Sequence, residues 1–362
     1  MKIGLIGLPL TGKTTFFNLL TNSGKNIGTT KGRTEANIGT AKIPDIRINY
    51  LAKIYNPKKV TFAAIEVIDI SGITPGGTSV KGSSSYHFLE SVRQVDALVH
   101  VVRSFGDDDI VHIDGSVNPL RDIETINTEL LFADLAVIEN RIERIQTGKK
   151  ITKENLEELE VLKKCRDCLE SENLINSMDL DDTQKQYIKT YNFLTERPLI
   201  LLLNLDEEQF KSAKYSGREA IIEYSANKNI PIIEVCAKTE LEISELDDED
   251  KILFMEDLGI KETGLSKLSS AMYNHLGLIS FLTVGEDEVR AWPVRRGINA
   301  KSAGGKIHSD IERGFIRAEV VKYSDLESLG SMQKVKEKGL AKLEGKESII
   351  EDGDIINFRF NV

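Results

Sequence analysis

The sequence predicts an α/β fold with more than one domain. Apolar strand-like runs at residues 2–6, 64–70 and 97–102 alternate with helical stretches, which is the βαβ pattern of a parallel sheet. From about residue 129 to residue 189, apolar residues recur every three or four positions, as in helices. Short strand-like runs separated by Gly and Pro begin near Leu278 and predict a small mixed β domain. A chain of 362 residues is long enough for two or three such domains, each with its own core.

The residues directly after the first strand-like run carry the complete phosphate-loop pattern G-x-x-x-x-G-K-[ST]. Glycines let such a loop curl so that its backbone N–H groups face a phosphate, and the following helix adds its positive N-terminal end. We expect Lys13 to act as a catalytic group at the β- and γ-phosphate oxygens and Thr14 to bind Mg²⁺. The residues predicted to contact the nucleotide here are Gly7, Leu8, Pro9, Leu10, Thr11, Gly12, Lys13, Thr14 and Thr15.

Composition excludes several other classes of protein. The net charge of −10 disfavours a protein that coats nucleic acid over its whole surface. No apolar run approaches the ~20 residues of a membrane helix and no signal-peptide pattern is found, so we expect a cytoplasmic protein without membrane partners. Cys165 and Cys168 form a C-x-x-C with no second ligand pair nearby, which favours two thiols on a helix over a metal site.

A second motif, Asp69-Ile70-Ser71-Gly72, ends a strand-like run and has the D-x-x-G form of a nucleotide switch. We expect Asp69 to hold Mg²⁺ through water and the N–H group of Gly72 to sense the γ-phosphate during catalysis. Ras-like enzymes carry a water-orienting Gln after this glycine, whereas this chain has Ile73. Because Ile makes no side-chain hydrogen bond, slow turnover is expected without a partner.

The later strand at 199–203 is followed by Asn204-Leu205-Asp206-Glu207, where GTPases carry N-K-x-D. The Asp of that motif accepts the N1–H and N2 amino protons of guanine, and here a longer Glu stands in its place. This change favours ATP over GTP. The triplet 236–238 matches the S-A-K loop that closes over the base. The predicted base-binding residues are Asn204, Leu205, Glu207, Cys236, Ala237 and Lys238.

The helical region is predicted to be an antiparallel hairpin, a short coiled coil, broken at residues 148–150. The sheet pattern resumes after Pro198, so the hairpin is an insertion within the α/β domain. Its charged outer faces are compatible with a spacer arm and with a tip that binds a partner, and both interpretations stay open.

A local basic stretch lies in the C-terminal region. Residues 290–322 contain eight Lys or Arg residues against three Asp or Glu residues. Trp292 and Phe315 interleave with these basic residues, so contact with nucleic acid and a simple solvated face both remain possible.

Several segments together resemble the YchF or Obg-like ATPase family of translation-associated P-loop proteins. The resemblance covers nearly the whole chain and is most specific at its C-terminus; the segments are 69–72, 96–103, 126–130, 204–207, 306–310, 314–318 and 358–362. It implies a C-terminal TGS domain, which is a ubiquitin-like β-grasp module. It also implies Mg²⁺-dependent hydrolysis of ATP in preference to GTP, and binding to the ribosome at the large subunit or intersubunit region. Contacts with ribosomal RNA or tRNA would come from the TGS and helical domains.

The residue patterns and the resemblance together give the expected domain bounds. They are a nucleotide-binding domain at 1–128 and 195–277, an inserted hairpin at 129–194 and a TGS domain at 278–362.

Three departures from the family pattern cluster around the phosphates. Leu10 replaces the usual Asn, the switch I segment at 31–37 lacks both expected prolines, and residues 78–87 replace a Gly-rich segment. Nucleotide binding is therefore a firmer expectation than turnover. Two alternatives remain: an Obg-type GTPase in ribosome assembly, and a nucleotide-gated interaction scaffold with negligible hydrolysis.

Overall fold

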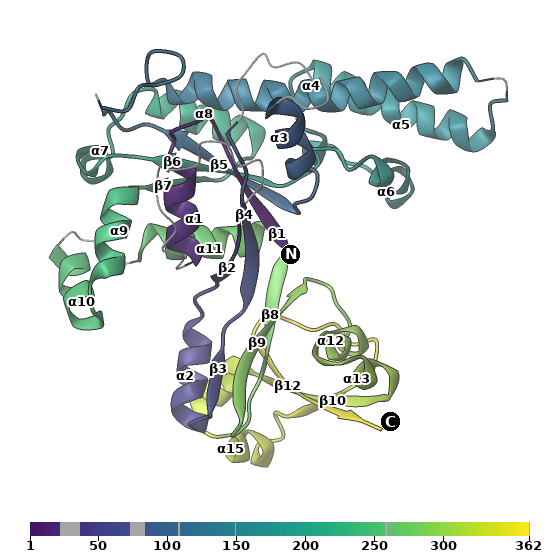
Figure 1. Ribbon diagram of the computed structural model, residues 1–362. Helices are drawn as coiled ribbons and strands as arrows, with labels where there is room; N and C mark the ends of the chain where they lie inside the picture. The colour runs from purple at the N-terminus through teal and green to yellow at the C-terminus, as the bar shows by residue number, and fades with distance from the viewer. Residues whose placement is uncertain are drawn as a thin grey trace. The chain divides into compact units, whose positions relative to one another are not determined.

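The computed structural model describes residues 1–21, 37–72, 84–107, 109–148, 150–257, 260 and 262–361. These residues form two compact units, each with strands and helices of its own (Figure 1). The first unit comprises Met1–Thr40 and Glu66–Leu268, and the second comprises Ala41–Ile65 and Ser269–Val362. No helix among the described residues is long and apolar enough to cross a membrane.

The first unit contains a six-stranded sheet in the order β2-β4-β1-β5-β6-β7. Pairing is parallel from β4 through β1, β5 and β6 to β7. Every residue of β5 and β6 is buried, as expected for parallel strands covered on both faces. The fold-class prediction of a P-loop α/β sheet is confirmed. The strands are β1 (Lys2–Ile6), β2 (Asn37–Lys42), β4 (Ala64–Asp69), β5 (Ala97–Arg103), β6 (Leu199–Asn204) and β7 (Ile232–Val235).

Helices flank this sheet and follow most of its strands. Together with two short 3₁₀ turns at Ile175–Ser177 and Lys189–Tyr191, they are α1 (Lys13–Thr21), α3 (Ser84–Val92), α4 (Pro119–Gln146), α5 (Lys153–Glu170), α6 (Asp182–Ile188), α7 (Glu207–Ser212), α8 (Arg218–Lys228), α9 (Ala237–Glu245), α10 (Asp248–Asp257) and α11 (Gly264–His275).

The predicted hairpin is formed by α4 and α5, which lie side by side in Figure 1. Their facing apolar residues belong to one core cluster, and Arg141 on α4 pairs with Glu158 on α5 at 2.7 Å. Helix α4 begins at Pro119, before the predicted start of the insertion at 129, because Asn118 caps it and proline is well suited to a first helical position. Its first turns pack in the same core as the sheet.

The second unit contains a mixed six-stranded sheet in the order β11-β10-β12-β8-β9-β3. Helix α12 packs on one face of it through Ala300 and Ala303. The strands are β3 (Lys59–Thr61), β8 (Leu278–Thr283), β9 (Glu288–Arg295), β10 (Phe315–Lys322), β11 (Lys342–Glu344) and β12 (Asp354–Phe360), and the helices are α2 (Ile46–Tyr55), α12 (Ala300–Ile307), α13 (Ser309–Arg313), α14 (Tyr323–Leu329) and α15 (Met332–Glu337).

Residues 41–65 belong to the second unit, whereas the predicted bounds kept them within 1–128. Strand β3 pairs in parallel with β9, and the hydroxyl of Thr61 donates to Glu288, 227 residues further along the chain. Arg47 adds an ion pair to Asp352 at 2.7 Å. The structure also ends the first unit at Leu268, within α11, rather than at Gly277. Strand β3 has only three residues, and its partner β9 is far away in the sequence. No local pattern therefore predicts this pairing.

Candidate nucleotide-binding site

The phosphate loop joins β1 to α1, and three of its residues have left-handed backbone. The φ angles are +143° at Gly7, +63° at Leu10 and +97° at Gly12. A Cβ atom on Gly7 would lie 2.4 Å from the carbonyl oxygen of Val101, and one on Gly12 would lie 2.5 Å from the Asn204 amide nitrogen. Both glycines are therefore required by the close approach of a neighbouring atom, backbone at Gly7 and side chain at Gly12, as well as by φ.

Lys13 begins α1, and its side chain is only 7% exposed. Its ammonium group donates to the carbonyl oxygens of Leu8 at 2.6 Å and Gly7 at 3.2 Å. Burial lowers the pKa of Lys13 to about 8, although the charge of nearby Asp69 acts in the opposite direction. An anion beside this ammonium would relieve the cost of burying its charge.

Asp69 and Gly72 lie against the same loop from the end of β4. The Thr14 hydroxyl donates to Asp69 Oδ2 at 2.9 Å, so two oxygen donors of the kind preferred by Mg²⁺ lie together. A Cβ atom on Gly72 would lie 2.9 Å from the Pro9 nitrogen and 3.1 Å from Lys13 Nζ. The structure thus brings the predicted catalytic and metal-binding residues into one cluster.

Asn204, at the end of β6, connects the phosphate loop to the loop after β7. Its amide nitrogen donates to the carbonyl oxygen of Thr11 at 3.1 Å, and its amide oxygen accepts from the Ala237 N–H at 3.2 Å. Cys236, the residue between β7 and α9, is also buried. Because both ends of the Asn204 amide are already bonded, this side chain braces the two loops.

The remaining predicted base-binding residues divide into a buried and an exposed set. Leu205 is 2% exposed and its side chain lies in the hydrophobic core. Only its main chain is therefore left to face the predicted base site. Lys238 is exposed and Glu207 is partly exposed, and the two form an ion pair at 2.9 Å between the ends of two loops. The hydrogen bond from Lys238 holds the pKa of Glu207 below its usual value.

Arg103 is a residue of this site to which the sequence assigned no role. It ends β5 with only 2% exposure and donates to the carbonyl oxygens of Phe105, Asp107 and Ile110. The N–H group of Ser104 in turn donates to the carbonyl oxygen of Asn204 at 2.9 Å. Arg103 therefore holds the loop after β5 in place next to Asn204. In the sequence, the signal that could have singled it out is an arginine at the end of an apolar strand-like run.

His100 lies on β5, in register with Ile6 on β1. It is 1% exposed, and burial together with the charge of Lys13 lowers its pKa to about 3. Its Nδ1 atom has no hydrogen-bond partner among the described residues. The imidazole is therefore neutral at physiological pH and adds no positive charge beneath the phosphate loop.

His112, Asp114 and Asp122 also lie close enough together to hold a metal ion, with ligand atoms within 4.8 Å of one another. The N–H group of Asp114 donates to His112 Nδ1, so Nε2 carries the proton and donates to Asp122 at 2.9 Å. The guanidinium group of Arg121 lies 2.8 Å from Asp122 and 3.7 Å from Asp114. Arg121 thus pairs with both carboxylates and both ring nitrogens of His112 are hydrogen-bonded, so the cluster is a hydrogen-bonded network near the start of α4 whose ligand atoms are already engaged.

Parts of the predicted switch regions lie outside the described residues. They are Ile73, residues 31–36 of the switch I segment and residues 78–83 of the segment that replaces the Gly-rich run; the side chains of 84–87 are likewise outside.

The parallel sheet, phosphate loop and D-x-x-G cluster define a P-loop protein of the GTPase fold class. Residues 2–132 match the family described as "50S ribosome-binding GTPase", and residues 278–361 match YchF-GTPase_C, described as "Protein of unknown function (DUF933)". The chain belongs to the YchF family, as its similarity to known members shows. It is 44% identical over 367 residues to "Ribosome-binding ATPase YchF" of Bacillus subtilis, with 100% of both chains covered.

Two further relatives agree with this assignment. The Haemophilus influenzae protein named "Ribosome-binding ATPase YchF" is 43% identical over 363 residues, which cover 100% of this chain and 99% of that one. The solved structure of the Schizosaccharomyces pombe YchF GTPase is 31% identical and has a TM-score of 0.88, covering 99% of this chain and 97% of that chain. The predicted family and fold class are confirmed.

Proposed function

We propose that the protein is a Mg²⁺-dependent ATPase whose nucleotide state controls its association with the ribosome. The relatives named above as ribosome-binding ATPases support this function at the level of the family. In this chain, the observation that most supports the proposed function is the cluster of Lys13, Thr14, Asp69 and Gly72 around the phosphate loop.

Each residue of this cluster has a distinct part in the proposal. Lys13 exchanges the carbonyl oxygens of Gly7 and Leu8 for phosphate oxygens, which form stronger, charge-assisted hydrogen bonds. Thr14 and Asp69, whose side-chain oxygens lie 2.9 Å apart, would hold Mg²⁺. When bound, Mg²⁺ neutralises negative charge on the phosphate oxygens. The N–H group of Gly72 lies close enough to the loop to respond to a γ-phosphate.

Base preference is proposed to favour ATP over GTP. Guanine presents an N1–H and an N2 amino group that require a carboxylate acceptor, but Glu207 is already paired with Lys238. Adenine has neither of these donor groups, and its amino group needs only a carbonyl acceptor.

Turnover is proposed to be slow without a partner, because Ile73 and Leu10 have no polar side chain to offer to the phosphates.

Ribosome contacts are proposed for the second unit and for the helical hairpin, with ribosomal RNA or tRNA as the bound molecule. The exposed basic residues of the second unit include Arg295, Arg296, Lys301, Lys306 and Arg313. Arg290, in the same basic stretch, is half-buried, and its guanidinium group stacks 3.8 Å from the Trp292 ring centre. The proposed docking region is the large subunit or the intersubunit region, in the cytoplasm.

Phosphate release from ATP and from GTP, measured with and without ribosomes, tests the proposal. The proposed function requires faster release from ATP and stimulation by ribosomes. A preference for GTP would favour the Obg-type GTPase, and release too slow to measure in both conditions would favour the nucleotide-gated scaffold.

A further inference from the structure

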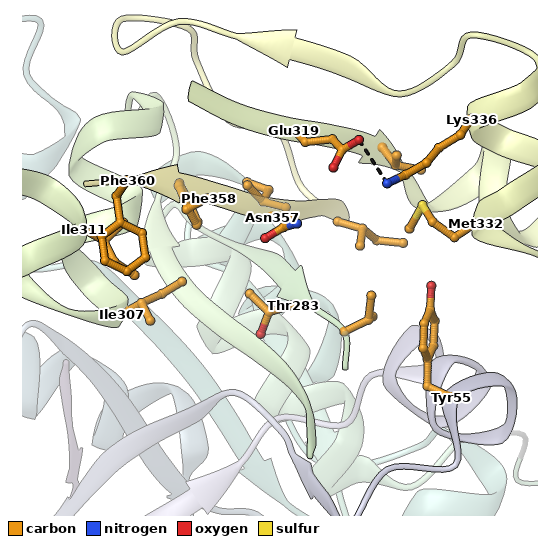
Figure 2. A pocket seen from close by; sticks show the side chains of 14 residues that line it. Tyr55, Thr283, Ile307, Ile311, Glu319, Met332, Lys336, Asn357, Phe358 and Phe360 are labelled. Carbon is orange, nitrogen blue, oxygen red and sulfur yellow. Dashed lines mark ion pairs between the residues drawn. The ribbon is translucent and has the colours of Figure 1, made fainter. Parts of the chain in front are cut away.

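A cavity of about 440 Å³ opens in the second unit where two strands of its sheet separate (Figure 2). Strands β8 and β12 pair in parallel at Leu282 and Ile355. Within the described part of the chain, no strand pairs with this edge of β12 beyond that point. Burial changes at the same place: residues 354–356 are buried, Asn357 is exposed and Phe360 is 45% exposed.

The cavity follows the edge of β12 rather than either of its faces. Successive residues of a strand point to opposite faces, yet Ile356, Asn357 and Phe358 all line this cavity. Figure 2 shows Phe360 beside Ile307 and Ile311 at one end. Side chains from α2 and α15 line the other end: Tyr55, Met332 and Lys336.

Several hydrogen-bonding groups at this edge have no partner in the described parts of the chain. A strand edge without a neighbour presents a row of main-chain N–H and C=O groups, here over residues 357–360. The Tyr55 hydroxyl is buried and has no hydrogen-bond partner among the described residues. Burial raises the pKa of Tyr55, so the hydroxyl stays protonated and is available as a donor.

The charge of the cavity favours a protein over a nucleic acid as its occupant. Its charged lining residues are Glu319 and Lys336, which pair with each other at 3.1 Å. No net positive charge remains in the lining to attract phosphates, whereas the apolar side chains and the free main-chain edge fit an uncharged extended chain.

We propose that the edge of β12 from Asn357 to Phe360 binds an extended peptide segment of a partner protein, which adds a strand in the opening between β12 and the end of β8. Successive side chains of the bound segment, which point to opposite faces of the added strand, enter the two ends of the cavity. One packs an apolar group against Phe360, Ile307 and Ile311. The next presents a polar acceptor to the Tyr55 hydroxyl. This site goes beyond the proposed function, since it requires neither nucleotide nor ribosome.

The test uses the full-length chain with labelled Ile and Met methyl groups, observed by NMR. The probe is a blocked synthetic peptide of about seven residues in which valine alternates with serine, with a lysine at each end for solubility. We expect its addition to shift the methyl signals of Ile307, Ile311 and Met332 with a dissociation constant of about 1 mM or tighter. A second peptide, N-methylated at alternate amides, should bind at least about tenfold more weakly because it cannot complete the ladder.

Variants test whether the peptide binds at this site or at exposed apolar side chains in general. Phe360→Asp should abolish the shifts, and Tyr55→Phe, which removes only the hydroxyl group, should weaken binding about threefold to tenfold. Ile46→Asp is the matched control, because Ile46 is 83% exposed at the first turn of α2, where an acidic residue is tolerated. It should leave binding unchanged.

Three results would overturn the proposal. One is the absence of shifts at millimolar peptide, since main-chain pairing does not depend on a particular sequence. Another is equal binding of the N-methylated peptide. The last is a set of shifts produced by octauridylate but not by peptide, which would make nucleic acid the occupant. If Phe360→Asp fails to fold, the Tyr55→Phe variant and the N-methylated peptide still decide.

Discussion

The buried ammonium group of Lys13 predicts a pH dependence of ATP binding that ordinary lysines do not give. Burial sets its pKa to about 8 in the free protein. Bound phosphate oxygens favour the charged form, so the pKa of Lys13 rises in the complex. Above pH 8, binding must therefore take up a proton, and the affinity for ATP should fall as the pH rises.

The size of the effect follows from the fraction of Lys13 that is protonated before binding. With a pKa of about 8, that fraction falls about tenfold between pH 7 and pH 9, and the dissociation constant of Mg-ATP should rise by about the same factor. Calorimetry in buffers of different ionisation enthalpy should show uptake of nearly one proton near pH 9 and almost none at pH 7.

Variants test whether the Lys13 side chain causes this pH dependence of ATP affinity. Lys13→Arg keeps the charge at every pH tested and should remove the pH dependence, while Lys13→Ala should lose about 2–3 kcal/mol of binding free energy at pH 7. Lys238→Ala, at an exposed lysine, should retain the wild-type profile. A wild-type affinity that stays flat from pH 7 to pH 9, with no proton uptake, would refute the reasoning.

Lys13 also makes the stability of the free protein depend on pH. Its folded-state pKa lies below its ordinary value of 10.5, so the unfolded state binds more protons between about pH 8 and pH 10.5. Stability should therefore gain a contribution as the pH rises through this window, and Lys13→Ala should remove that contribution in denaturant titrations.

Other predictions concern the base, the phosphates and the second unit. Leu205→Lys combined with Glu207→Asp restores the N-K-x-D form and should raise the preference for GTP; an unchanged ratio of ATP to GTP dissociation constants would mean that the base is selected elsewhere. Leu10 offers no oxygen to a monovalent cation, so replacing K⁺ by Na⁺ at constant ionic strength should change turnover by less than about twofold, and a tenfold stimulation by K⁺ would contradict this. Charge reversal at Arg295 and Arg296 should weaken co-sedimentation with ribosomes and flatten its salt dependence, with ATP affinity unchanged. Full retention of binding would move docking to the hairpin or to the first unit.

Local patterns in the sequence predicted much of the site. The spacing of Gly7, Gly12 and Lys13 fixed the phosphate loop, because the turn, the close approach and the helix start are all encoded within a few residues. Continuous apolar runs alternating with helical stretches likewise predicted the parallel sheet, and spacings of three and four predicted the hairpin formed by α4 and α5.

Features that depend on distant partners were not predicted. Strand β3 has three residues, and its place beside β9 is set by contacts more than two hundred residues away. The bracing roles of Asn204 and Arg103 depend on which loops the folded sheet brings together. The lowered pKa of Lys13 depends on burial, which no residue type determines by itself.

The central claim is that the cluster around Lys13 hydrolyses ATP in response to the ribosome. The most direct test measures phosphate release from ATP and from GTP by the wild-type chain and by Lys13→Ala, each with and without ribosomes. We expect release from ATP to exceed release from GTP, to increase when ribosomes are added, and to be lost in the variant while its fold is retained. Equal release by wild type and Lys13→Ala, or a wild-type rate that ribosomes do not change, would contradict the account.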